Sequence, residues 1–257
     1  MKKYKLTEET IIVNGKILYR IEALRDFANV KKGDKGGFVE KENNLSQYGD
    51  SWVYDDAKVF GNAVVCGYAR VLGYAQVCGN AQVYGHASVR GNAEVYGSAS
   101  VRGNAQVYDE AKVYDYAEVY DNAEVLGNAE VYDNAKVFEN AEVSFDAKVY
   151  EYAKVYEYAM VQGNAKVYGN AEIRTNACIY GDAVIDSIGD YIVFKNFWSS
   201  GRSFTWTRSN DMWKVGCFYG TGEELIKKAY KESEISGREY ERIVKYVEVI
   251  NNDLEIM

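Results

Sequence analysis

Proline is absent from this chain of 257 residues, and histidine occurs only once. The four cysteines include no CxxC pair, so together with one histidine they cannot form a usual zinc site. No apolar run reaches the roughly 18 residues of a membrane-spanning helix. The first ten residues contain lysines without a following apolar core, so we expect no signal peptide and a reduced, cytoplasmic protein.

Basic residues are outnumbered by acidic ones, with 30 Lys and Arg against 38 Asp and Glu, so the formal net charge is −8. This balance argues against direct binding to nucleic acid or to an anionic membrane surface. The chain contains no P-loop, GxGxxG, HExxH or GxSxG motif, which are the common signatures of nucleotide-binding and hydrolytic sites. We therefore predict neither a metal nor a cofactor.

An alanine recurs every six residues from Ala57 to Ala183 without a break, which makes 22 alanines. Val or Ile follows two residues after each one, from Val59 to Ile185, and the unit reads (G/D/E)-(N/Y)-A-x-V-x. Alternate side chains of a strand face opposite sides, so A-x-V-x predicts a short strand with Ala and Val facing inward. The Gly-Asn or Asp-Asn pair before it is typical of a sharp corner.

Three units form one triangular coil, so the repeat predicts a mainly β fold of about seven stacked coils, with strands about 4.8 Å apart. Alanines spaced by six residues do not share one face of a helix, which argues against a helical repeat. Val followed four residues later by Ala resembles the hexapeptide-repeat family, whose pattern is aliphatic-x-x-x-small-x. That resemblance implies a left-handed parallel β-helix, and only the resemblance supplies the handedness.

The flanks of the repeat divide the chain into a cap over 1–50, the β-helix over 51–187 and a second cap over 188–257. Asn14-Gly15 lies between two apolar runs and predicts a β-hairpin. The glycine-rich stretch 33–39 is interpreted as a turn that enters the first coil, and Ser51-Trp52-Val53 fits the register of that coil. Such caps are expected because the ends of a β-helix expose unpaired backbone groups.

The C-terminal segment predicts a small α+β cap. Aromatic-rich strands are expected over 191–194, 204–206 and 213–218. Two helices should follow, the first with a capping box at Thr221 and the second with one at Ser236. Within the second helix, Tyr240, Ile243, Val244 and Val247 share one apolar face at helical spacing.

The whole layout resembles a group of uncharacterised phage, prophage and bacterial β-helix proteins. The resemblance rests on the entry segments 36–40, 44–46 and 50–54 and on the tail segment 215–221. It implies a viral or bacterial origin and a location in the cytoplasm of a bacterial host. Some members are labelled acyltransferases, a label that rests on fold analogy alone.

Residues 18 positions apart should lie directly above one another, which predicts ladders of tyrosine along the prism. The first ladder comprises Tyr96, Tyr114, Tyr132, Tyr150 and Tyr168, and a second face carries Tyr84, Tyr120 and Tyr156. Stacked aromatics suit flat parallel sheets, so a structural role is one interpretation. The alternative is a rigid interaction face for a partner protein or another copy, since tyrosine is favoured at interfaces.

Acidic residues stack at two corners in the same way, as Asp115, Asp133 and Glu151 and as Asp121, Glu139 and Glu157. Residues 55–186 hold 19 acidic and 10 basic side chains, so the prism carries the acidity of the chain. The two interpretations of these corners are a solvated acidic rim and a site for a cation or a basic partner.

His86 is the one candidate catalytic residue. The family resemblance implies acyltransferases that use a histidine as general base and bind coenzyme A between neighbouring prisms. His86 occupies the corner position that usually holds Asn, where a positive φ is tolerated by histidine. The repeat has no inserted loop to cover an active site, which weakens the enzymatic interpretation.

The unbroken prism and the missing catalytic motifs favour a non-catalytic binding or assembly scaffold. In its sharper form, a phage or prophage protein would engage a host macromolecule, for instance to inhibit a defence system, through its acidic, tyrosine-rich faces. One alternative is an acyltransferase that uses acetyl coenzyme A and His86. The other is binding of a small nucleotide or similar ligand by the C-terminal cap, where Trp198, Trp206, Trp213 and Tyr219 cluster in sequence.

Overall fold

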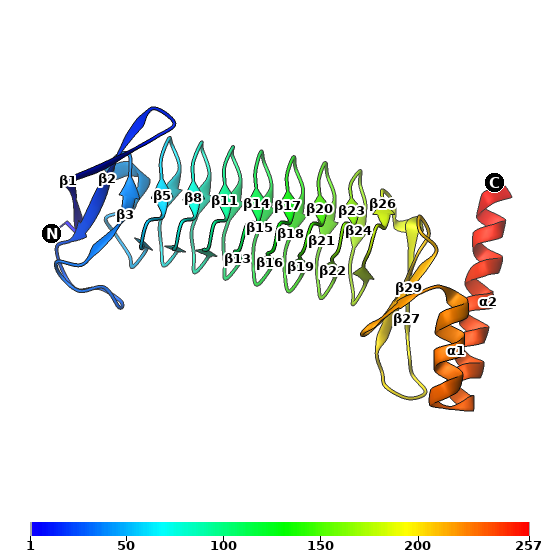
Figure 1. Ribbon diagram of the computed structural model, residues 1–257. Coiled ribbons are helices and arrows are strands. Elements are labelled where there is room, and N and C mark those ends of the chain that lie inside the picture. Colours follow the sequence, from blue (N-terminus) through cyan, green and yellow to red (C-terminus); the bar gives the residue numbers. More distant parts are fainter. Residues whose placement is uncertain (1, 257) are drawn as a thin grey trace.

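The computed structural model describes the backbone of residues 2–256 and the side chains of residues 2–253. Stacked coils of nearly constant shape form a long prism, with a β cap at its N-terminal end and a sheet with two helices at its C-terminal end (Figure 1). The mainly β fold class is therefore confirmed, as a parallel β-helix with a cap at each end. No helix in the described part of the chain is long and apolar enough to span a bilayer.

Three parallel sheets form the faces of the prism. The first face contains β3 (Lys35–Val39), β5 (Lys58–Val59), β8 (Gln76–Val77), β11 (Glu94–Val95), β14 (Lys112–Val113), β17 (Glu130–Val131), β20 (Lys148–Val149), β23 (Lys166–Val167) and β26 (Val184–Ile185). The second face contains β4 (Trp52–Val53), β7 (Arg70–Val71), β10 (Ser88–Val89), β13 (Gln106–Val107), β16 (Glu124–Val125), β19 (Glu142–Val143), β22 (Met160–Val161) and β25 (Cys178–Ile179). The third face contains β6 (Val64–Val65), β9 (Gln82–Val83), β12 (Ser100–Val101), β15 (Glu118–Val119), β18 (Lys136–Val137), β21 (Lys154–Val155) and β24 (Glu172–Ile173).

The inward side chains of the repeat form one continuous core. Each repeat alanine from Ala57 to Ala183 is at most 1% exposed, and each valine or isoleucine two positions later is 0% exposed. Consecutive coils are joined by backbone hydrogen bonds along the prism axis, as from Tyr132 N–H to the carbonyl of Val149 at 3.0 Å. Residues 18 apart lie in register, so Glu94 pairs with Lys112 as the repeat predicts.

The corners place the positive φ on the first residue of each unit rather than on the second. Gly85 has φ of 70° and Asp121 has φ of 58°. His86 is not among the residues with positive φ, so the suggestion that histidine was chosen for such a conformation is wrong. Glycine is favoured at position 85 because a Cβ there would lie 2.9 Å from the backbone nitrogen of Gly103 in the next coil.

The N-terminal hairpin is confirmed, with β1 (Tyr4–Val13) paired antiparallel to β2 (Lys16–Ala23) across Asn14-Gly15. The predicted turn over 33–39 is only partly correct. A turn occurs at Gly33 (φ 93°), but β3 is a strand that pairs antiparallel with β2 and parallel with β5. Gly36 is required there for close packing, because a Cβ would lie 2.5 Å from the carbonyl oxygen of Val53.

The first coil also contains a short 3₁₀ helix, η1 (Glu42–Asn44). Trp52–Val53 pairs with β7 in the predicted register. Parallel pairing already begins upstream of it, since Val39 lies opposite Val59 and Leu45 forms a bridge with Val65. This upstream pairing was not predicted, because the alanine repeat starts only at Ala57.

The C-terminal cap contains η2 (Ile188–Asp190), an antiparallel sheet and two helices. The sheet order is β27 (Tyr191–Lys195), β28 (Ser203–Thr207), β29 (Met212–Val215) and β30 (Phe218–Gly220). The strand predicted over 213–218 is in fact two strands, because the chain reverses at Gly216 with φ of 53°. Helix α1 (Gly222–Glu232) begins with the predicted capping box, in which Thr221 Oγ1 accepts from Glu224 N–H at 3.3 Å.

The second predicted capping box is wrong, because α2 (Glu234–Ile256) begins before Ser236. The hydroxyl of Ser233 accepts a hydrogen bond from Ser236 N–H at 3.1 Å and thus caps the start of this helix. Its predicted apolar face is confirmed. Tyr240, Val244 and Val247 are buried, and Ile243 packs against the same cluster.

The two ends of the prism leave different backbone groups unpaired, and the two caps satisfy them accordingly. Since N–H groups donate toward the following coil, the first coil has free carbonyls, which accept from the Tyr4 hydroxyl and the Lys3 ammonium. The last coil has free N–H groups. Cys178 N–H donates to Thr205 Oγ1 at 2.9 Å, and Val184 N–H donates to Ser209 Oγ at 2.7 Å.

Candidate functional surfaces and a basic pocket

The tyrosine ladder of the first face forms as the repeat predicts. Its rings lie parallel, with centroids 4.8 Å apart between Tyr96 and Tyr114 and 5.1 Å apart between Tyr150 and Tyr168. The Tyr114 hydroxyl donates to Glu130 at 2.9 Å. Burial, with Glu130 nearby, raises the pKa of Tyr114, and burial and the neighbouring Tyr150 raise the pKa of Tyr132 to about 12.

The third face carries the second ladder. Tyr120, Phe138 and Tyr156 stack at 4.9 Å, and the guanidinium of Arg102 lies 4.1 Å from the centre of the Tyr120 ring. Tyr84 lies one coil beyond Arg102 toward the N-terminus and is half-buried. The rings of both ladders are half-buried, since each covers the next, and their role as an interaction face stays a prediction.

The most exposed rings of the prism lie at its corners. Tyr116 is 67% exposed, and Tyr152 and Tyr158 are each 62% exposed. These corner rings were not predicted, because the predicted ladders follow the outward positions of the strands. The signal was present, since tyrosine replaces asparagine at these corner positions of the repeat.

Ion pairs join neighbouring coils within the ladders. Glu130 contacts Lys148 at 2.9 Å, and Glu118 contacts both Arg102 at 2.7 Å and Lys136 at 2.8 Å. Burial alone would raise the pKa of Glu118, but its hydrogen bonds to Lys136 and Arg102 lower it below the usual value. These charges are therefore partners of one another rather than free catalytic groups.

The acidic corners have a structural role that their stacking did not predict. Asp133 accepts a hydrogen bond from Glu151 N–H, Glu151 from Gly169 N–H at 3.0 Å, and Glu157 from Thr175 N–H at 2.8 Å. Each carboxylate thus pairs a corner amide of the following coil. Asp115 shares this position on one corner, and Asp121 and Glu139 share it on the other.

One acidic corner forms a shallow hollow of about 540 Å³, lined by Asp121, Glu139, Glu157 and the intervening asparagines. The asparagines form their own ladder, with Asn104 donating to Asn122 at 3.0 Å. No group of three or more His, Cys, Asp or Glu side chains arranged to hold a metal ion occurs among the described residues.

His86 is exposed at a corner, and its ring stacks on Tyr68 with centroids 4.6 Å apart and planes 3° apart. Among the residues that the structure describes, no side chain forms a hydrogen bond with its ring nitrogens. A histidine base is normally oriented by a carboxylate or carbonyl on its second nitrogen. The described surroundings of His86 supply the stacking partner but not that orienting group.

The tryptophans of the C-terminal cap pack in or against its hydrophobic core. Trp206 and Trp213 are each 2% exposed between the sheet and the helices, and Trp206 donates to Asp211 at 2.8 Å. Trp198 packs edge-on against Tyr240 with centroids 5.3 Å apart. Tyr219 lies elsewhere, edge-on to Tyr180 of the last coil, so the four aromatics do not form one binding site.

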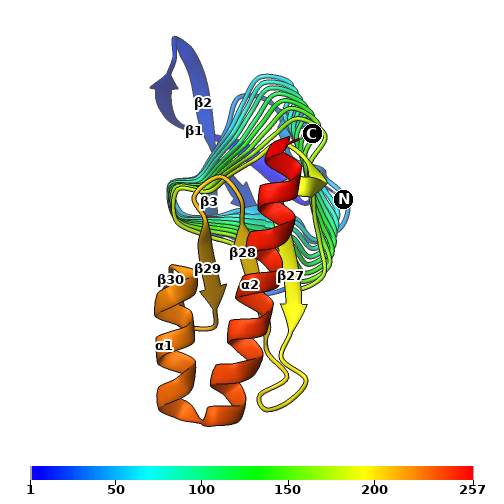
Figure 2. The same cartoon turned by 90° about the vertical axis from the view of Figure 1, so that its right-hand side faces the viewer.

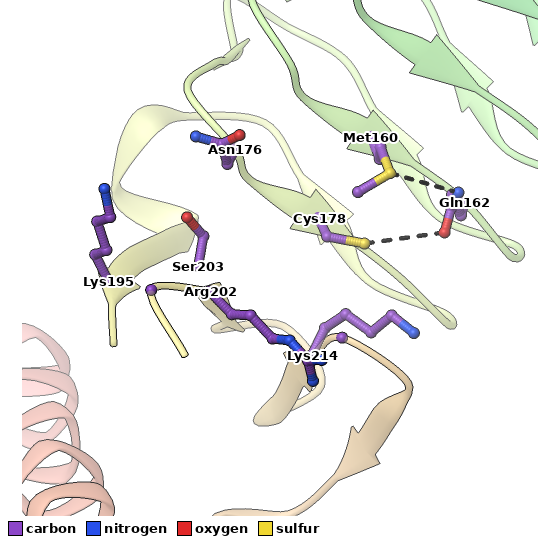
Figure 3. Close-up of a pocket in the computed structure, with 10 residues that line it drawn as sticks. Met160, Gln162, Asn176, Cys178, Lys195, Arg202, Ser203 and Lys214 are labelled. Atoms are coloured by element: carbon purple, nitrogen blue, oxygen red, sulfur yellow. Dashed lines mark hydrogen bonds between the residues drawn. The ribbon is translucent and has the colours of Figure 1, made fainter. Parts of the chain in front are cut away.

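A cavity of about 620 Å³ lies where the second face of the prism meets the C-terminal sheet (Figure 3). The prism contributes Met160, Gln162, Asn176 and Cys178, and the cap contributes Lys195, Gly201, Arg202, Ser203, Lys214 and Gly216. Local sequence patterns did not predict this pocket, because its residues come from five strands and four loops that only the tertiary fold brings together.

The comparisons with known proteins are limited in extent. No protein-family model matches the chain. The chain is 37% identical, over an alignment of 73 residues, to YdcK, an uncharacterised acetyltransferase of Escherichia coli K12, and the match covers 25% of the chain. The match spans 22% of that protein. This partial identity and the parallel β fold fit a hexapeptide-repeat β-helix.

Proposed function

We propose that this chain is a non-catalytic binding scaffold whose prism engages a protein partner. This proposal rests on one observation: the polar side chains of the prism are bonded to or stacked on other groups of the prism itself. Glu157 pairs a corner amide, Tyr114 and Glu130 bond to each other, and His86 stacks on a tyrosine. What the prism offers to other molecules is a long, regular surface with exposed aromatic corners and an excess of acidic charge.

The chemistry of this surface favours a partner with a basic surface. Tyr158 is exposed beside the stacked carboxylates of Asp121, Glu139 and Glu157, so one corner combines an aromatic anchor with negative charge. In the finer form of the proposal, the partner is a macromolecule of a bacterial host engaged by a phage or prophage protein. Self-association is the competing outcome, which light scattering on the purified chain would detect.

The test neutralises this corner without disturbing the fold. The triple variant Asp121→Asn, Glu139→Gln, Glu157→Gln keeps amide oxygens that accept hydrogen bonds but removes three charges. The matched control neutralises three exposed helix carboxylates, as Glu223→Gln, Glu232→Gln and Glu248→Gln. We expect a stoichiometric partner recovered by the wild type at low salt to be lost by the corner variant and kept by the control. Equal recovery by all three would contradict the proposal.

A second candidate function is favoured by the partial identity to YdcK, which is named an acetyltransferase. In that case His86 would act as the general base toward acetyl coenzyme A. The test compares acetyl transfer by the wild type and by His86→Ala, with circular dichroism as the control for folding. Activity that survives in His86→Ala, or no activity in the wild type, would argue against this function.

A further inference from the structure

The C-terminal sheet has two chemically different sides. Phe204, Trp206 and Trp213 lie in the core against the helices. Lys195 lies opposite Ser203, and Lys214 lies opposite Thr205, which faces the prism and bonds to the last coil. Because side chains alternate along strands, Lys195, Ser203 and Lys214 share the side that Thr205 occupies.

The cap lies off-centre on the end of the prism, so part of this polar side is left uncovered (Figure 2). Figure 2 shows the lower part of the cap extending past the outline of the stacked coils. Figure 3 shows the prism strands and the cap strands meeting at an angle, with side chains from both around the space between them. The cavity of about 620 Å³ occupies this notch.

Three cations and no carboxylate line the notch. Within the described side chains, Lys195, Arg202 and Lys214 have no acidic group within ion-pair distance. Lys214 instead places its ammonium 4.2 Å from the centre of the Tyr180 ring. In a chain of net charge −8, three unpaired cations around one cavity give this place a locally positive potential that attracts an anion.

The prism side of the notch is neutral. Asn176 and Gln162 contribute amide groups, and Met160 and Cys178 contribute apolar surface. Burial raises the pKa of the Cys178 thiol to about 11, so this thiol is uncharged near neutral pH. The wall therefore suits the uncharged, organic part of a ligand whose charge lies against the cap.

We propose that this notch binds a small phosphate-bearing anion of about nucleotide size. Its volume lies within the usual range of small-molecule sites, roughly 300–1,000 Å³. A guanidinium presents a planar pair of donors that matches phosphate oxygens, and an ammonium adds a point charge. The proposal does not depend on the binding scaffold proposed above, because the notch lies at the end of the prism.

Titration calorimetry on the full chain at low salt tests the chemistry of the ligand. The probes are inorganic triphosphate, ATP, citrate as a tricarboxylate, and adenosine as an uncharged control. We expect triphosphate and ATP to bind, citrate to bind more weakly, and adenosine to give no heat. Citrate binding as tightly as triphosphate would overturn the assignment to phosphate. An absence of binding by every anion at about 1 mM would overturn the site itself.

Substitutions test the location. The double variant Arg202→Gln, Lys214→Gln should weaken triphosphate binding by about tenfold or more, because it removes two charge-assisted contacts. Lys166→Gln, at an exposed lysine on the first face of the prism, is the matched control and should bind as the wild type does. Thermal melting followed by circular dichroism verifies that each variant is folded. Unchanged binding in the double variant would place the anion elsewhere and overturn the proposal.

Discussion

The corner residue at positive φ is the most constrained position of the repeat. A residue with a Cβ pays about 1–2 kcal/mol to adopt the left-handed conformation, which is why glycine is common there. At Glu151 and Glu157 the side chain offsets part of this cost by accepting a hydrogen bond from the next coil. Phe145 has φ of 62° and a side chain that is 56% exposed, and it forms no such bond in the described structure.

Phe145 is therefore a position where glycine, which has no Cβ, should stabilise the protein. We expect Phe145→Gly to raise the free energy of unfolding by about 0.5–1 kcal/mol, after the greater flexibility of glycine in the unfolded chain is subtracted. Phe145→Ala keeps the Cβ and should give no such gain. Urea unfolding followed by circular dichroism measures both. A loss of stability in Phe145→Gly would show that the ring packs usefully at this corner.

Tyr132 of the first ladder and Tyr108, which follows β13 on the second face, should make stability depend on pH in the alkaline range. The pKa of Tyr108 is raised to about 12 by burial and by its hydrogen bond to Glu124, and that of Tyr132 is also about 12, against 10 for a free tyrosine. The folded state thus holds these protons more tightly than the unfolded state does. Their contribution is complete below about pH 10 and is lost as the pH rises from 10 toward 12.

The measurement is the urea midpoint between pH 8 and pH 12. The double variant Tyr108→Phe, Tyr132→Phe removes both titrating groups, and its midpoint should fall less steeply above pH 10 than that of the wild type. Tyr48→Phe, at a ring that is 84% exposed, is the control and should follow the wild type. Identical slopes in the double variant and the wild type would refute the assignment.

At the scale of the element, the caps match the polarity of the hydrogen bonds along the prism. Donors from Lys3 and Tyr4 meet the free carbonyls of the first coil, whereas hydroxyl acceptors of the C-terminal cap meet the free N–H groups of the last. Unpaired strand edges at either end would otherwise be free to pair with another chain. The N-terminal cap thus ends the stack with hydrogen-bond donors, and the C-terminal cap ends it with acceptors.

The acceptor at Thr205 can be removed with little change in shape. We expect Thr205→Val to lower the free energy of unfolding by about 1–3 kcal/mol, because the buried N–H of Cys178 would lose its partner. Thr205→Ser keeps the hydroxyl and should retain most of the stability. Hydrogen exchange should show faster exchange at the Cys178 amide in the valine variant alone. Equal protection in both variants would contradict this role.

At the scale of the whole molecule, the prism is a linear stack in which each coil bonds only to its two neighbours. Stability in such repeat proteins is roughly a sum over coils and their interfaces. A whole coil can therefore be removed without changing which faces meet the caps. A single unit of six residues cannot, because its removal turns every later strand onto the next face.

Deletion of residues 91–108 tests this additivity. Gln76 would then lie against Lys112, and Val77 against Val113, so the register of the first face is kept. We expect a single cooperative thermal transition and an unchanged shape of the circular dichroism spectrum. The variant that lacks residues 91–96 should melt at a lower temperature than the variant that lacks residues 91–108. In the shorter deletion Cys78 would lie against Arg102, and the tyrosine ladder would be offset. Equal melting temperatures would argue that the ladders contribute little.

Some features could be predicted because they depend on neighbours close in sequence. The six-residue period places Ala and Val in the core, and the spacing of 18 aligns Tyr96 with Tyr114, since each follows from local geometry repeated many times. The hairpin at Asn14-Gly15 and the cap at Thr221 are equally local. Gly36 was misjudged because its need for space comes from Val53, which reaches it only in the folded coil.

The sequence by itself determined the architecture of the prism, because one short pattern repeated without interruption admits one way to bury alanine and valine. Only the tertiary structure decided which polar and charged side chains remain available to bind other molecules. It joined Glu157 to a backbone amide of the next coil, left His86 stacked on Tyr68, and brought Lys195 and Lys214 beside Asn176. Such partnerships depend on atoms that are distant in sequence, so no local pattern records them.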